Sequence, residues 1–495
     1  MADTGDNGVS AYDLVSLVRS CCEYDQSIDA AEEELSETAS WVLGSMTERL
    51  DKLKINGQPI ICKIPNEIRA GHDRDYEPNI IAIGPYHREK PALKPMKEVK
   101  LMYLRHICDR NEEKTLRRYV VAMEAVELEA RRMYNESFEI DSNDFIEMLV
   151  VDGCFIVEFL LKRAEGRVGE FPLAFQLRAG PTLRRDFLLF ENQIPFFVLQ
   201  KILDLTTHLG GLTILDIALH YLYKGKMSKE ALPVEEREIH HLLHLSHLCL
   251  VSKLKYSQEE TSDESPPKNL SDRLFVCLKH GLIYALVVCF NVVVIWKWSC
   301  WSHFRSDIPA KDIQRMARTI PTATQLKEAG VHFKKKETNK CFLDISFKDG
   351  NMEIPAVTIQ ENTSSEYRNF LALEQTCKDY GNKFTSYVVF MDNLIDTAHD
   401  VALLKKSKII ESKLGCAEDV AMFFNEIRSG LCFDFNKHYL VGIFKDVNSY
   451  YNKTINRWRA TLMHDYLSSP WAIISLMGAI VLIILTTLQT AYSIN

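Results

Sequence analysis

The sequence lacks the short motifs by which many enzymes and nucleotide-binding proteins are recognised. It has no P-loop, no GxGxxG after a predicted strand, no GxSxG and no Cys/His signature. Gly210-Gly211 is an isolated pair, and Lys334-Lys335-Lys336 is a short charged run typical of a solvated surface. These absences remove the usual reasons for assigning an enzymatic class, so we expect no enzyme, no catalytic residues and no cofactor.

Paired cysteine spacing and a secretory leader are missing as well. None of the 13 Cys lies in a CxxC pair, and their number is odd. The N-terminal MADTGDNGVSAYDLV has no basic region followed by an apolar one, so it does not resemble a signal peptide. We therefore expect the folded part of the chain to lie in a reducing compartment.

A surplus of basic residues is also absent. The chain has 59 Lys and Arg against 67 Asp and Glu, a net charge of −8. The first 55 residues hold 12 acidic and 4 basic residues, which accounts for all of that charge. A neutral body without a basic stripe argues against a nucleic-acid partner. With 46% hydrophobic residues, the chain has ample material for a folded core.

The C-terminal residues contain no charge from Tyr466 to Asn495. About 20 helical residues cross the roughly 30 Å hydrocarbon layer of a bilayer, and the apolar run from Trp471 to Leu488 approaches that length. Ser468-Ser469-Pro470 has the pattern of a helix cap followed by proline. We expect a transmembrane helix over residues 468–492 that contacts lipid through residues 470–492. Its predicted anchor residues are Pro470, Trp471, Ile473, Leu476, Ile480, Leu482, Ile484, Leu488 and Tyr492.

The charges beside this segment predict its orientation. Lys445, Lys453, Arg457 and Arg459 precede it, and no basic residue follows. The positive-inside rule then places the body in the cytosol, so the layout is that of a single-pass tail anchor. The alternative is a buried helix of a soluble core, which we disfavour because such helices seldom run this long without one charge.

A second uncharged run, GLIYALVVCFNVVVIW, spans residues 281–296. It is short for a membrane span and contains Asn291. The preceding YSQEETSDESPPKNLSD is acidic and rich in Ser and Pro, as in a disordered linker. A second span here would place residues 311–465 across the membrane from the N-terminal part, and we disfavour that topology.

The hydrophobic periodicity predicts a mainly α (α+β) fold: a large helical body, a small β-hairpin and the C-terminal helix. We expect helices over residues 11–55, 96–134 (as a pair), 145–163, 366–380 and 417–428. LLFENQIPFFVLQKIL should be interrupted at Pro195. Apolar residues from Leu440 to Leu462 step by three and four, which predicts one long helix leading into the anchor.

Extended structure is expected at three places. PIICKIP and NIIAIGPYH are short β-type runs that end at proline or glycine. CFLDISFKDGNMEIPAVTI has alternating apolar residues around Asp349-Gly350, the pattern of a hairpin. The resulting division is an acidic leader (1–40), a first body part (41–256), a linker with an apolar insertion (257–314), a second body part (315–467) and the anchor (468–492).

The densest group of candidate metal ligands is EIHHLLHLSHLCL. His240, His244 and His247 are spaced so that three imidazoles can share one helix face, as a zinc site requires. No HExxH glutamate or distal carboxylate pattern accompanies them. We favour the alternative of an amphipathic helix with its leucines inward and its histidines at the edge.

Four acidic residues in apolar surroundings are the candidates for acid–base chemistry. Glu147, Asp152 and Glu158 interrupt an apolar helix, and Glu191 lies in FENQIPFF. Two such carboxylates brought together in a cleft would suit a membrane-tethered hydrolase. Pairing with arginine or helix capping is the more common role, and we favour it.

Several ordered blocks resemble one family. These blocks include IPNEIRAGHDRDYEPNIIAIGPYH, FIEMLVVDGCFIVEFLL, DFLLFENQIPFFVLQKIL, IPTATQLKEAGVHFK and MEIPAVTIQENTSSEYRNFLALEQ. The sequence resembles the plant domain of unknown function 247 family over about residues 40–256 and 315–490. The resemblance implies membrane association through the C-terminal helix, with the plasma membrane preferred. It also implies a protein-interaction role in recognition or signalling, because some grass members are linked to pollen self-incompatibility. It supplies no catalytic residues.

The segment of about residues 257–314 departs from the family pattern, because an apolar, Trp-rich stretch precedes the IPTATQLKEAG block. It is either a lineage insertion or a retained intron or misjoined exon. Continuous coverage of residues 250–320 in mature transcripts would exclude the second explanation.

Overall fold

The computed structural model describes most of residues 36–461 and the helix at 470–494. The gaps in that description are residues 56–59, 70, 112–115, 136–139, 168–172, 208–210, 225–226, 228–231, 233–237, 260–317, 338–340, 429 and 462–469. The chain divides into two units, Met1–Pro59 and Ile60–Asn495. In the first, helix α2 (Glu37–Ile55) confirms the C-terminal part of the helix predicted over 11–55, and the rest of that prediction lies outside the described residues. The apolar run at 281–296 also lies outside the described residues.

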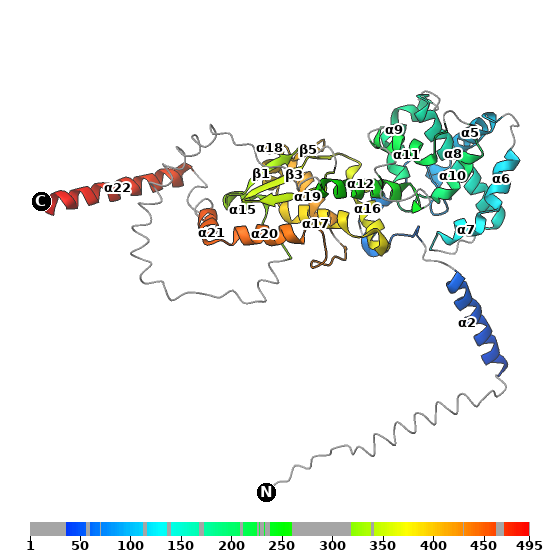
Figure 1. The fold of residues 1–495 in the computed structure, drawn as a ribbon, viewed down its shortest axis with the longest axis horizontal. Coiled ribbons are helices and arrows are strands. Elements are labelled where there is room, and N and C mark those ends of the chain that lie inside the picture. The colour runs from blue at the N-terminus through cyan, green and yellow to red at the C-terminus, as the bar shows by residue number, and fades with distance from the viewer. Residues whose placement is uncertain are drawn as a thin grey trace, which may run out of the picture. The chain divides into compact units, whose positions relative to one another are not determined.

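The first part of the second unit is built around α8 (Ser142–Ala164), which confirms the predicted buried helix. Asp141 caps it by accepting the Asp144 N–H. Most of its residues are buried on all sides, because α5, α6, α10 and α11 pack around it (Figure 1). The elements of this part are α3 (Asn66–Arg69), α4 (Asp73–Tyr76), η1 (Pro91–Leu93), α5 (Met96–Asp109), α6 (Leu116–Glu124), α7 (Glu127–Arg132), α9 (Leu173–Phe187), α10 (Phe196–Asp204), α11 (Ile214–Tyr223) and α12 (Leu242–Glu259).

Two predictions for this part need correction. The described residues of 96–134 form three helices, α5 to α7, and not the predicted pair. In their described residues, PIICKIP and NIIAIGPYH form no strands: Ile61 makes one isolated bridge to Tyr134, and residues 81–83 are irregular. The interruption at Pro195 is confirmed, since α9 ends at Phe187 and α10 begins at Phe196.

The second part contains both sheets. Strands β1 (His332–Lys336), β3 (Asn351–Pro355) and β2 (Ser346–Lys348) form one sheet in that order, with β1 parallel and β2 antiparallel to β3. Strands β4 (Val357–Ile359) and β5 (Ile410–Ser412) pair in parallel. Asp349 (φ 49°) and Gly350 (φ 78°) both adopt left-handed conformations, as the tight hairpin between β2 and β3 requires. The predicted hairpin is confirmed, whereas β1 and β5 were not predicted.

Helices surround these sheets. They are α15 (Ala323–Glu328), α16 (Thr363–Thr376), η5 (Lys378–Tyr380), α17 (Lys383–Leu394), α18 (Ala398–Lys406), α19 (Ala417–Ile427), α20 (Val441–Tyr451) and α21 (Thr454–Thr461). The helices predicted over 366–380 and 417–428 correspond to α16 and α19. On α19, Val420, Phe424 and Ile427 are buried, as their spacing predicts.

The long helix predicted up to the anchor is wrong. Helix α20 ends at Tyr451, and α21 begins at Thr454. The carbonyl of Tyr450 accepts hydrogen bonds from the Lys453 N–H at 3.3 Å and from Asn456 Nδ2 at 2.7 Å. These bonds satisfy a carbonyl that has no helical partner at the end of α20, so the helix terminates there.

Helix α22 (Pro470–Ile494) is uncharged and has 25 residues, so the C-terminal helix is confirmed as a helix. Among the residues that the structure describes, no helix is long and apolar enough to cross a membrane. Of the predicted anchor residues, Leu482 and Ile484 are described and exposed. The side chains of the others lie outside the description: Pro470, Trp471, Ile473, Leu476, Ile480, Leu488 and Tyr492.

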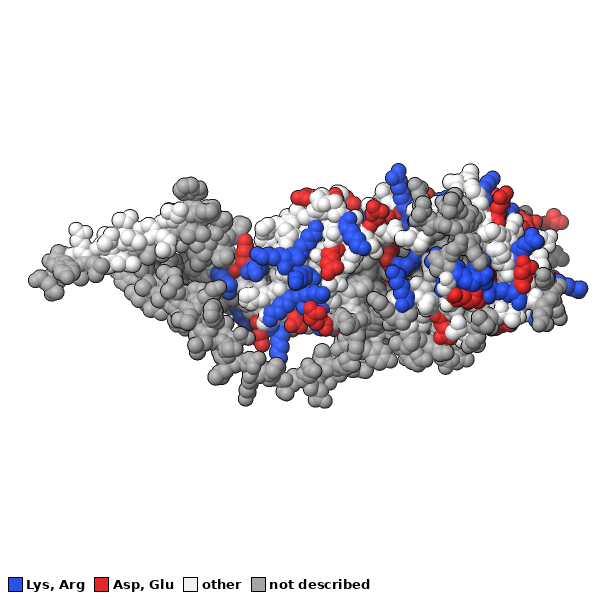
Figure 2. Space-filling model, turned by 90° about the horizontal axis from the view of Figure 1, so that it is seen from above, with Lys and Arg blue, Asp and Glu red and all other residues white. Residues whose placement is uncertain are grey.

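The fold is therefore mainly helical with small sheets, as expected. Basic and acidic side chains are interspersed over the described surface in Figure 2, in agreement with the near-neutral charge of the body.

Candidate functional site

A strongly polar part of the core is the turn between α9 and α10, with the sequence FENQIP. Pro195 prevents a continuous helix, so residues 188–195 turn through the interior of the protein. Glu191, Asn192 and Gln193 are each at most 2% exposed. Polar side chains this deeply buried are stable only when hydrogen bonded, so their partners determine what the turn can do.

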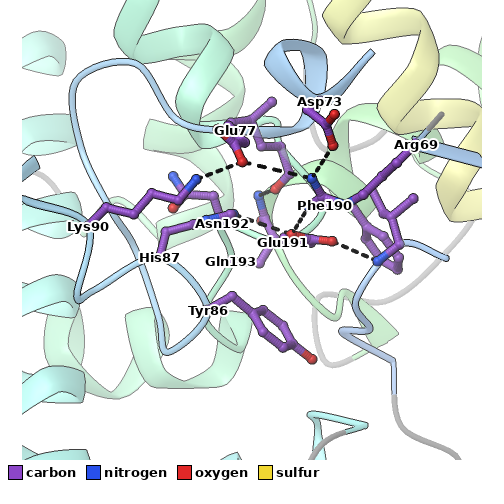
Figure 3. A network of polar contacts seen from close by, with 12 residues as sticks. Arg69, Asp73, Glu77, Tyr86, His87, Lys90, Phe190, Glu191, Asn192 and Gln193 are labelled. Atoms are coloured by element: carbon purple, nitrogen blue, oxygen red, sulfur yellow. Dashed lines mark hydrogen bonds and ion pairs between the residues drawn. The ribbon is translucent and has the colours of Figure 1, made fainter. Parts of the chain in front are cut away.

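Glu191 lies close to Arg69 and His87, as Figure 3 shows. Its carboxylate accepts the Ile64 N–H at 2.7 Å and a short hydrogen bond from Arg69, and His87 Nε2 lies 3.4 Å away. Burial alone would raise the pKa of Glu191. The contacts from His87, Arg69 and Ile64 outweigh burial and hold this pKa below its ordinary value, so the group is ionised at neutral pH.

The network continues outward from Arg69 to the protein surface. Asp73 lies 3.4 Å and Glu77 4.0 Å from Arg69, and Lys90 lies 2.9 Å from Glu77 (Figure 3). Arg69 thus joins a buried carboxylate to two acidic residues that are about half exposed. This arrangement fixes the segment before α4 against the turn.

A second set of buried acceptors holds residues 79–84. Asp186 accepts the N–H groups of Asn79, Ile80 and Ile81 at 2.7–3.1 Å. Asn192 Oδ1 accepts the Ile83 N–H at 2.7 Å. These bonds take the place of strand pairing, which is why NIIAIGPYH is not a strand.

Gly84 completes this arrangement. Its N–H donates to Asp152 Oδ2 at 2.9 Å, and Lys100 forms a short ion pair with the other oxygen of Asp152. Gly84 has φ +75°, and a Cβ atom there would lie 2.5 Å from the Gln193 carbonyl oxygen. Only glycine permits this approach of the two segments.

The carboxylates proposed for a hydrolase do not form a free pair. Asp152 is paired with Lys100, and Glu191 with Arg69. Glu158 receives two hydrogen bonds from Arg110, at 2.5 and 3.2 Å. Burial raises the pKa of Glu158, and the contacts from Arg110 oppose this increase. Since Glu147 is exposed on the surface of α8, these four residues give no support to the hydrolase interpretation.

The histidine group lies inside the protein. His241, His244 and His247 are at most 4% exposed, and His240 is partly buried. The prediction that histidines line the edge of the helix is therefore wrong, although Leu242, Leu243 and Leu245 are buried as expected. Among the described residues, no group of three or more His, Cys, Asp or Glu is placed to hold a metal ion.

The contacts of the imidazoles are with other protein groups. His240 Nδ1 lies 2.6 Å from the Tyr380 hydroxyl, and His247 Nε2 lies 2.7 Å from Glu374 Oε1. His244 Nδ1 accepts the His240 N–H at 3.2 Å. Glu374 also accepts the N–H groups of Phe384 and Thr385 in the first turn of α17. The cluster therefore joins α12 to α16 and α17.

Burial sets the protonation of two of these histidines. It lowers the pKa of His241 to about 3, with a further contribution from His240. It lowers the pKa of His244 to about 2, assisted by its three histidine neighbours. Both rings are neutral at physiological pH.

Several of the polar residues that organise this core were not singled out from the sequence. They are Asp186, Asn192, Asn369 and Glu374. Asn369 Oδ1 accepts the Phe190 N–H at 2.8 Å and so connects α16 to the FENQIP turn. The available signal was the occurrence of polar residues inside otherwise apolar runs, which marks buried polar groups but not their partners.

Comparison with known proteins gives the family. Residues 61–485 match the family described as plant protein of unknown function, DUF247. The chain belongs to this family. The UPF0481 protein At3g47200 of Arabidopsis thaliana is 28% identical over 439 residues, which cover 88% of this chain and 86% of that protein. The putative UPF0481 protein At3g02645 of the same plant is 25% identical over 490 residues, covering 87% and 89%. No solved structure matches this DUF247 chain.

Proposed function

We propose that this DUF247 protein is a binding protein without catalytic activity of its own, tethered to a membrane through α22. The body would face the cytosol, with the plasma membrane as the preferred location, and would bind other proteins in recognition or signalling. The observation that supports the tether is the uncharged, apolar character of α22.

Helix α22 exposes apolar side chains on all sides. Five consecutive residues, 481–485, are each 50–64% exposed, and five successive positions of a helix point in all directions around its axis. At 25 residues the helix is about 37 Å long. An uncharged helix whose described side chains are all exposed is unfavourable in water, and this supports a lipid environment for it.

Fractionation of plant cells that express the full chain tests the tether. We expect the protein to sediment with membranes and to resist extraction by alkaline carbonate. The double variant L482K/I484K should move to the supernatant, since two central lysines weaken insertion by about 6–8 kcal/mol. The matched control is I455K, which alters an apolar side chain that is 76% exposed on α21 and should remain with the membranes.

Wild-type protein with an intact tail in the high-speed supernatant would overturn the tether. Protease protection on sealed membranes tests the orientation: residues 60–461 should be digested from the cytosolic side, and protection of that region would contradict the proposal.

The binding role is supported by the surface of α6 and α7. Val121 and Leu128 are 53% and 68% exposed, and Leu116 on the same helix as Val121 is 45% exposed. Large apolar side chains exposed at a protein surface are candidates for sites where proteins associate.

Proximity labelling from the full chain tests this role. We expect a reproducible set of labelled neighbours that is lost in the variant V121K/L128K. The control M422K changes a side chain that is 55% exposed on α19 and should keep the set. Identical labelling by all three proteins would remove α6 and α7 as the interaction surface.

A further inference from the structure

A cavity of about 350 Å³ lies between the two parts of the second unit, away from the Glu191 network. Its walls come from α9, α11 and α12 on one side, and from β4, α16 and the residues before β2 on the other. This volume is at the lower end of the range for small-molecule sites, so a ligand that fills it is compact.

One wall of the cavity is aromatic. Phe342, Tyr367 and Phe370 line it, and the rings of Phe342 and Tyr367 are stacked with centroids 6.3 Å apart. Tyr223 also lines the cavity, and its hydroxyl donates to the Ser246 carbonyl at 3.0 Å. Because that hydroxyl already has an acceptor, Tyr223 presents mainly its ring, and together with Phe342 and Phe370 it offers a surface suited to a hydrocarbon or aromatic group.

The charged part of the lining is an ion pair. Arg184 Nη2 donates to Glu366 Oε1 at 3.0 Å, and the side chains are 33% and 26% exposed. Among the described residues, this bond uses one N–H of the five on Arg184 and one oxygen of Glu366. The remaining donors and the second oxygen retain the capacity to bind a ligand.

The charges select the class of ligand. A simple anion at Arg184 would be repelled by the carboxylate 3.0 Å away, and a simple cation at Glu366 would be repelled by the guanidinium. A zwitterion avoids both penalties, because its carboxylate accepts from Arg184 while its ammonium donates to Glu366.

We propose that this cavity binds an α-amino acid with an apolar side chain, as a free amino acid. Its carboxylate contacts Arg184, its ammonium contacts Glu366, and its side chain packs against Phe342, Tyr367 and Phe370. This site goes beyond the tether and is independent of it, since it lies entirely within residues 184–370.

Isothermal titration calorimetry of the purified full chain tests the site with L-phenylalanine as the probe. We expect saturable binding. Phenylacetate, which lacks the ammonium group, and phenethylamine, which lacks the carboxylate, should each bind at least tenfold more weakly. This comparison needs no variant. Absence of L-phenylalanine binding, or equal affinity for phenylacetate, would overturn the proposal.

Variants of Arg184 and Glu366 test whether this ion pair binds the ligand. R184Q and E366Q should each weaken L-phenylalanine binding at least tenfold. The control R428Q removes a comparable ion pair, in which Arg428 lies 2.8 Å from Asp392, and neither residue lines the cavity. R428Q should bind as the wild type does, and unchanged binding by folded R184Q and E366Q would place the ligand elsewhere and refute the site.

Discussion

The N–H groups of residues 79–84 and those of the hairpin at 346–355 are satisfied in different ways. In the first region, the acceptors are side chains of Asp186, Asn192 and Asp152, which follow 68–109 residues later in the sequence. In the hairpin, the acceptors are backbone carbonyls of neighbouring strands. The first region therefore depends on a few buried polar side chains, whereas the second depends on a turn and on repeated pairing.

The two regions should respond to different substitutions. A single carboxylate serves three N–H groups in the first region, so its loss leaves three donors unpaired at once. In the hairpin, a side-chain change leaves the ladder bonds in place and acts through the conformation of the turn.

Asp186→Ala should have the largest effect. Asp186 is fully buried, and Arg185 contributes a further contact at 3.0 Å. We expect the free energy of unfolding to fall by about 3–5 kcal/mol, the usual result of breaking a buried charged pair. Urea unfolding measures it. The control Asp204→Ala removes an exposed carboxylate bonded to Gln200 and should change stability by less than about 1 kcal/mol. Equal stability of the two variants would refute the role of Asp186.

Acid should have the next largest effect, by weakening the contacts of α12 with α16 and α17. The folded-state pKa values of His241 and His244, about 3 and about 2, lie below the ordinary value of 6.5. The unfolded state therefore binds more protons below pH 6.5, and stability is lost as the pH falls toward 3. From pH 7 to pH 5 the two groups together remove up to about 4 kcal/mol.

Urea unfolding at several pH values measures this loss. His244→Gln should reduce the pH dependence by about half between pH 6.5 and 5. The control His399→Gln alters an exposed histidine on α18 and should retain the full pH dependence of the unfolding free energy. If the unfolding free energy depends on pH equally in the wild type and in both variants, these rings do not control acid stability.

Gly350→Ala should have a smaller effect on the hairpin. Gly350 has φ +78°, and a Cβ atom would lie 2.6 Å from the Tyr450 hydroxyl. We expect a loss of about 1–3 kcal/mol in unfolding free energy. Gly442→Ala is the matched control, because Gly442 lies in α20 with open space around it; it should stabilise the protein by up to about 1 kcal/mol. Loss of stability in both variants would show that the turn is not the cause.

The sequence predicted the elements whose signals are local. The apolar residues from Phe145 to Leu161 predict a buried helix, whichever elements pack against α8. Pro195 prevents a helix from continuing through it, and Asp349-Gly350 favours one type of turn. These expectations are confirmed because each depends on neighbouring residues.

The predictions that were wrong concern segments whose hydrogen-bond partners are distant in the sequence. NIIAIGPYH has a strand-like composition, but a strand also requires a partner strand, and Asp186 and Asn192 occupy that role. His241 and His247 were expected at a helix edge; His247 is buried against Glu374, 127 residues away. A single sequence has no periodic pattern that shows which distant residue will pair with a buried polar group.

Hydrogen exchange at the amides of Asn79, Ile80 and Ile81 tests the central claim most directly. If Asp186 replaces a strand partner, the three amides should exchange slowly in the wild-type chain, at rates similar to those of β3. In Asp186→Asn, which keeps one carbonyl acceptor, protection should fall at these amides and persist at β3. Rapid exchange of all three amides in the wild type would contradict the account.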